Sequence, residues 1–237
     1  MKIFRKIRQI LISEGKVKRY LLYAIGEILL VMIGILLAFS VSNWNENQVK
    51  RNTELRHYKN VRDQIIGDKK AIAEKMEHND RLLNQFVYGS QIIETNDQSL
   101  IDTLGRIAIK LTDYSDFDRK GNIYETFVNS GEIKILNNQK IVAGLRRLEE
   151  KYIYINRMEN IHFEALLQYA VPLTTSAIRH SSGNVEKPDL LYSYQFQNII
   201  ILFLGVMKEK DEIYHEAIDR IDIIIALIDV ELKSKID

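Results

Sequence analysis

The chain of 237 residues is 46% hydrophobic and 27% charged, a composition that excludes an intrinsically disordered protein. Only two prolines and eleven glycines interrupt it, which favours long helices over a β architecture with frequent turns. Since there is no cysteine, disulfides, thiol catalysis and thiolate metal sites are excluded.

The net charge of +1 conceals an uneven distribution along the chain. Residues 1–19 carry seven Lys and Arg against one Glu, whereas residues 43–237 carry 26 basic against 30 acidic residues. A nucleic-acid-binding protein normally concentrates positive charge on its folded domain, so we exclude nucleic acid as a partner. We assign the basic cluster to a membrane surface and expect the lipid bilayer as a partner.

Residues 1–19 are predicted to form a cytoplasmic basic amphipathic arm. Within them, Ile3, Ile7 and Ile10 recur at helical spacing between basic residues, which predicts a helix over residues 3–12 that lies in the inner membrane interface. The alternative is a disordered arm that only sets the topology, because so short a helix is marginal in water.

Residues 20–42 are predicted to form one transmembrane helix. They contain no Lys or Arg, and about 20 apolar residues suffice to cross the bilayer core. Basic residues precede the segment and Trp44 follows it, so the positive-inside rule places residues 43–237 in the periplasm of a bacterium with its anchor in the inner membrane. A cleavable signal peptide is the alternative. Its apolar core would be shorter, about 7–15 residues, and would not contain Glu27.

Small residues form a stripe on the predicted membrane helix. Gly34, Ala38 and Ser42 follow one another at intervals of four, and Gly26 extends the stripe by two turns. Such stripes allow two helices to approach closely, and Glu27 lies near the same face, where a contact would shelter its carboxylate. We therefore predict helix association, with itself or with another membrane protein. The alternative is that Gly and Ala are simply common in membrane helices.

Several short blocks of sequence resemble an uncharacterised family of Bacteroidota-type single-pass membrane proteins, a domain of unknown function. The resemblance is strongest over residues 4–46, and a further block is residues 124–136, with Ser130-Gly131 in an apolar pattern. The blocks in the first range are Phe4 to Arg8, Ser13 to Lys16, Tyr23 to Ile28, Ile33 to Leu36 and Asn43 to Glu46. The resemblance implies a membrane anchor and an exported helical domain. It implies no activity and no catalytic residue.

Residues 43–237 are predicted to form an all-α domain, an antiparallel bundle of long helices. Helices are expected over residues 44–89, 99–111, 123–129, 138–177 with a bend near Pro172, and 190–235, with loops over residues 112–121 and 181–188. The capping-box spacing starts the second of these helices at Ser99. The first helix shows a heptad pattern typical of a bundle or coiled coil, with a polar break at Asn79. Its apolar positions are Tyr58, Ile65, Ile72, Phe86 and Ile93.

Three Glu-x-x-His motifs raise the possibility of a metal centre: Glu54/His57, Glu159/His162 and Glu212/His215. A di-iron bundle site needs two such motifs that point inward. The first and third share a helix face with other polar residues, so we expect them to face outward. Only Glu159 and His162 fall in an apolar register, which predicts a buried polar pair without metal or cofactor.

No other motif indicates catalysis. The run that begins at Asp116 resembles the opening of a calcium loop, but Lys120 stands where a ligand belongs. No phosphate loop, nucleophile elbow or HExxH motif is present. We therefore expect that the protein is not an enzyme. We expect instead a membrane-anchored helical interaction or scaffold module that is oligomeric. The alternatives are a periplasmic sensory bundle that binds a small molecule and signals through a partner, and a metalloenzyme.

Overall fold

The computed structural model describes residues 17–117 and 123–233. The predicted amphipathic helix over residues 3–12 and most of the calcium-like loop lie outside these ranges. The chain divides into two compact units, Met1–Thr53 and Glu54–Asp237. The described residues are almost entirely helical, which confirms the predicted all-α class.

Helix α2 (Val17–Thr95) contributes to both units. In the first unit its large apolar side chains are exposed, from Leu21 at 57% to Val41 at 65%. Among the described residues one helix, α2, is long and apolar enough to cross a membrane, by length and composition. A signal sequence near an N-terminus would meet the same criterion.

In the second unit, α2 buries the predicted heptad positions. Tyr58, Ile65, Ile72, Phe86 and Ile93 are each no more than 7% exposed. The break in the pattern, Asn79, is buried as well, and its side-chain amide donates a 2.8 Å hydrogen bond to the carbonyl oxygen of Met207 on α8.

After α2 the chain turns through the short 3₁₀ helix η1 (Gln98–Leu100) into α3 (Ile101–Lys110). The predicted cap at Ser99 is wrong, because the helical turn begins earlier. Asp97 caps it, accepting hydrogen bonds from the backbone N–H of Ser99 at 3.0 Å and from its hydroxyl at 2.6 Å.

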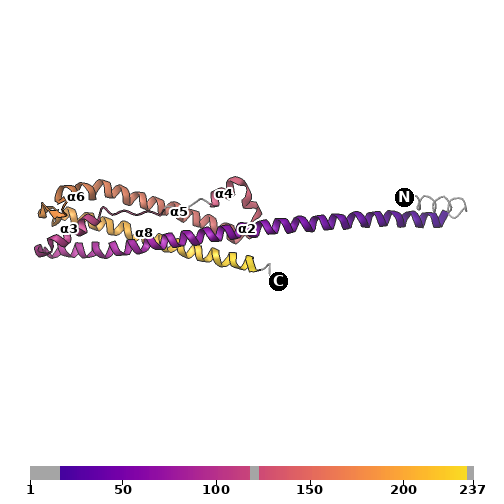
Figure 1. Ribbon diagram of the computed structural model, residues 1–237, viewed down its shortest axis with the longest axis horizontal. Coiled ribbons are helices and arrows are strands. Elements are labelled where there is room, and N and C mark those ends of the chain that lie inside the picture. The colour runs from indigo at the N-terminus through magenta and orange to yellow at the C-terminus, as the bar shows by residue number, and fades with distance from the viewer. Residues whose placement is uncertain (1–16, 118–122, 234–237) are drawn as a thin grey trace. The chain divides into compact units, whose positions relative to one another are not determined.

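An extended segment, residues 113–117, follows α3 and leads towards α4 (Ile123–Ser130). Figure 1 shows the described part of this segment running lengthwise along the bundle. The predicted end of α4 is confirmed: Gly131 has a φ of 74°, a left-handed conformation that favours glycine, and η2 (Glu132–Ile135) follows.

Helix α5 (Gln139–Ala165) starts at the capping residue Asn138. It continues into the π-helical segment η3 (Leu166–Ala170) and then α6 (Val171–Ala177). The predicted bend near Pro172 is thus a π turn just before the proline, because the proline ring has no N–H and displaces the preceding carbonyl.

A small antiparallel hairpin begins before the predicted loop over residues 181–188 and extends into it. Its strands are β1 (Ile178–Arg179) and β2 (Asn184–Val185), with Ile178 opposite Val185. The short helix α7 (Pro188–Leu191) and the long helix α8 (Tyr194–Lys233) complete the described chain.

Helices α2 and α8 run antiparallel. Arg62 on α2 contacts Asp229 on α8 at 2.7 Å, and Lys69 on α2 contacts Asp222 on α8 at 2.6 Å. Residue numbers therefore fall along α8 as they rise along α2. Helix α5 also packs extensively on α8, and in Figure 1 the three helices lie lengthwise beside one another.

Helices α2 and α5, in contrast, run parallel. The side chain of Glu54 accepts from the backbone N–H of Asn137 at 2.7 Å, and that of Asp68 accepts from the hydroxyl of Tyr152 at 3.0 Å. The chain therefore returns between them through α3, the extended segment and α4. Successive legs alternate in direction, as in an up-and-down bundle, but the extended segment interrupts the second leg between α3 and α4.

Candidate functional site

A layer of buried polar side chains divides the core of the second unit. On α5 one apolar cluster ends at Ile155 and the other begins at Ala165, while on α8 they meet between Met207 and Ile213. On α2 the corresponding gap lies between Ile72 and Leu82. The buried polar residues in these gaps, here called the polar layer, are Asn79, Glu159, His162 and Lys210.

Glu159 holds the extended segment against the bundle. Its Oε1 accepts a 2.7 Å hydrogen bond from the backbone N–H of Phe117 and a 2.6 Å bond from the hydroxyl of Tyr214 on α8. The side chain is 3% exposed. An extended backbone has no helical partners for its polar groups, so a bundle that buries one must supply acceptors and donors from side chains.

Lys210 supplies the matching donor. Its Nζ lies 3.3 Å from the carbonyl oxygen of Ser115 and 3.2 Å from Nδ1 of His162. The ring of Tyr114 covers this pair: its centroid is 5.8 Å from Nζ and 5.7 Å from the imidazole of His162. The ring of Phe203 packs against the imidazole at 5.3 Å.

Burial shifts the pKa values of three residues in the polar layer. It raises the pKa of Glu159, although hydrogen bonds from Tyr214 and Phe117 and the charge of Lys210 oppose the rise. Burial lowers the pKa of Lys210 to about 8. It also lowers the pKa of His162 to about 3, helped by the charge of Lys210, so at neutral pH this imidazole is uncharged and its Nδ1 accepts from the ammonium group.

The two residues of the predicted polar pair, Glu159 and His162, are each 3% exposed. The structure adds Lys210 and the backbone of residue 117 as their partners, and the backbone of residue 115 as a partner of Lys210. Sequence reasoning missed Lys210, although a signal existed: it continues the buried register of α8 set by Phe203, Met207 and Tyr214. The sequence could not show that the extended segment contacts these residues. The contacts are made by the backbone of Ser115 and Phe117, and side-chain identity does not specify them.

The other two Glu-x-x-His motifs differ from each other in burial. Glu212 and His215 are exposed, as predicted. The expectation that Glu54 faces outward is wrong, since it is 1% exposed. Its Oε1 accepts from the hydroxyl of Tyr58 at 2.9 Å and from the backbone of Asn137 at 2.7 Å, because the chain entering α5 also needs acceptors there. Among the described residues, no three His, Asp or Glu come together in a way that could hold a metal ion.

The small-residue stripe of α2 lies in open space within the described structure. A Cβ added at Gly26 or Gly34 would meet no atom within 4 Å, and Ala38 is exposed. Glu27, beside them, is partly buried. This face of the helix is therefore accessible to another helix.

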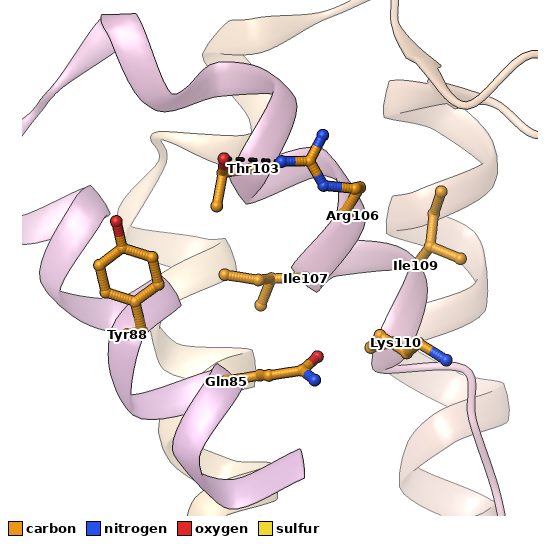
Figure 2. A pocket seen from close by; sticks show the side chains of 7 residues that line it. All are labelled: Gln85, Tyr88, Thr103, Arg106, Ile107, Ile109 and Lys110. Carbon is orange, nitrogen blue, oxygen red and sulfur yellow. Dashed lines mark hydrogen bonds between the residues drawn. The ribbon is translucent and has the colours of Figure 1, made fainter. Parts of the chain in front are cut away.

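A surface groove of about 470 Å³ lies between the end of α2 and α3. Figure 2 shows Tyr88 and Gln85 on α2 facing Thr103 and Ile107 on α3, with Arg106 and Lys110 at its rim. It is separate from the polar layer.

These features define an all-helical bundle with an internal polar layer and one helix apolar enough to cross a membrane. The chain belongs to a family of unknown function, DUF6090, which matches residues 27–205. The match includes both Glu27 and the polar residues of α5. No curated protein and no solved structure matches the chain.

Proposed function

We propose that this protein is a membrane-anchored, non-catalytic helical module that contacts other proteins. Residues 1–19 lie in the cytoplasm, residues 20–42 cross the inner membrane and residues 43–237 lie in the periplasm. The observation that carries the proposal is the exposed apolar surface of α2 between Leu21 and Val41. A surface of this size is stable only against lipid or another protein.

The interaction part of the proposal rests on the stripe of Gly26, Gly34 and Ala38. The absence of atoms over the two glycines leaves room for a second helix at close approach. A second copy of the chain is the simplest partner, because a closed pair of identical helices would cover Glu27 on both.

The non-catalytic part is supported by how the polar layer uses its groups. Glu159 and Lys210, which would be the natural acid–base groups, are buried and engaged with backbone atoms of residues 115 and 117. A catalytic group must reach a substrate, and these hold the fold together instead.

The test is self-association in the membrane. The full-length protein, labelled with donor and acceptor fluorophores in separate samples, is mixed in liposomes at low density. Gly34→Leu should abolish energy transfer, whereas Leu36→Phe, which adds volume on the opposite face, should preserve it. A strictly monomeric protein, or equal transfer in both variants, would refute the association.

A sensory bundle is the second candidate, and the groove between α2 and α3 favours it. By fold analogy, helical sensor domains bind small molecules between their helices. Signalling would then need a partner that the membrane helix could recruit.

A further inference from the structure

The groove between α2 and α3 exists because the two helices approach closely at one point and diverge beside it. Gly89 permits this approach: a Cβ there would lie 2.9 Å from Cγ2 of Ile107. On one side of the contact the ring of Tyr88 faces Ile107 across the groove, as Figure 2 shows. Tyr88 is 45% exposed, so its ring is available to a ligand.

The lining is apolar in the middle and cationic at the rim. Thr103, Ile107 and Lys110 follow at helical spacing along the face that α3 turns to the groove, and Arg106 lies next to them. No Asp or Glu belongs to the lining. The charge of the groove is therefore positive.

Arg106 can offer guanidinium N–H donors to a ligand. Its Nη2 donates a 2.9 Å hydrogen bond to the hydroxyl of Thr103, and within residues 17–117 and 123–233 no carboxylate pairs with it. Lys110, in contrast, contacts Asp113 at 3.2 Å. A guanidinium group with free N–H donors beside an apolar wall is suited to a carboxylate that carries a hydrophobic body.

We propose that this groove binds a small amphipathic carboxylate. The hydrophobic body, an aromatic ring or a branched chain, lies between Tyr88 and Ile107, and the carboxylate accepts hydrogen bonds from Arg106. The volume of about 470 Å³ falls in the range of roughly 300–1,000 Å³ that is usual for small-molecule sites. This site lies outside residues 20–42, the proposed membrane span, so it goes beyond the proposed anchoring and association.

The test uses the full-length protein in nanodiscs of neutral lipid and 2-naphthoate as the probe, with empty nanodiscs subtracted. Isothermal titration should show saturable binding. The uncharged analogue 2-naphthylmethanol should bind at least about tenfold more weakly, because it offers no charge to the guanidinium group.

Two arginine variants distinguish the site from general attraction to a basic surface. Arg106→Gln should weaken 2-naphthoate binding about tenfold or more. Arg147→Gln removes an exposed arginine on α5 and should leave binding unchanged. Tyr88→Ser should also weaken binding, since it removes the ring. Absence of saturable binding, equal binding of acid and alcohol, or equal effects of the two arginine variants would each overturn the proposal. None of these results bears on the energy-transfer assay with Gly34→Leu.

Discussion

Replacing Glu159 by leucine removes an acceptor that serves two buried donors at once. The backbone N–H of Phe117, 2.7 Å away, and the hydroxyl of Tyr214, 2.6 Å away, would both lose their partner. Each unsatisfied buried donor costs about 1–3 kcal/mol. Relief from burying a carboxylate offsets part of the loss, so we expect a destabilisation of about 2–4 kcal/mol.

The assay is thermal unfolding of the full-length protein in a neutral detergent, followed by circular dichroism. For a unit of this size each 1 kcal/mol lowers the Tm by about 2–4 °C, which predicts a decrease of about 4–16 °C for Glu159→Leu. Glu164→Leu is the matched control, because Glu164 is exposed on the same helix and its loss should change stability by no more than about 0.5 kcal/mol.

A double variant separates lost donors from general core damage. Tyr214→Phe alone removes a hydrogen bond, whereas in the Glu159→Leu background it removes an orphaned hydroxyl. It should therefore be less costly in that background by about 1 kcal/mol. If the two substitutions are additive, or if Glu159→Leu unfolds at the same temperature as Glu164→Leu, the account of the polar layer is incorrect.

Three further predictions concern the bundle. Gly89→Ala should destabilise it by about 1–3 kcal/mol in denaturant titration, since the new Cβ would lie 2.9 Å from a buried isoleucine side chain. Gly67→Ala is the control: it has open space around it and should stabilise the bundle by about 0.5–1 kcal/mol. Burial lowers the pKa of His162 from 6.5 to about 3, so its contribution to stability is complete above pH 6.5 and is lost as the pH falls. From pH 6.5 to 5 the unfolding free energy should fall by about 2 kcal/mol more in the wild type than in His162→Gln. His180 is exposed, so His180→Gln is the control and should show the same pH dependence as the wild type. Asn138→Ala should cost about 1 kcal/mol, measured as a shift of the urea midpoint, because its side chain caps α5 by accepting from two backbone N–H groups.

The polar layer also explains why residues that look like a metal motif lie in this bundle. The carboxylates of Glu159 and Glu54 both accept from backbone N–H groups where the chain is not helical, at Phe117 and at Asn137. Inward-facing acidic residues in this bundle thus accept hydrogen bonds from backbone N–H groups that have no helical partner.

The sequence by itself determined the features that depend on neighbours along the chain. Helical periodicity predicted the buried positions of α2 from Tyr58 to Ile93. The conformational preferences of glycine and proline predicted the helix end at Gly131 and the distortion before Pro172. Hydropathy alone located the apolar segment at residues 20–42. Each of these depends on a few residues within one or two turns, so it can be read without knowing what packs against it.

Tertiary structure alone decided that Glu54 lies inside and which groups the buried polar residues contact. Glu54 shares a helix face with polar residues and is nevertheless buried, because the chain entering α5 packs on it. Lys210 is buried beside the segment at Ser115, which runs along the bundle there. The parallel direction of α2 and α5 follows from the same irregular leg. These outcomes depend on contacts between residues about 80 or more positions apart, and the free energy of such a contact includes desolvation and hydrogen bonding that no single segment specifies.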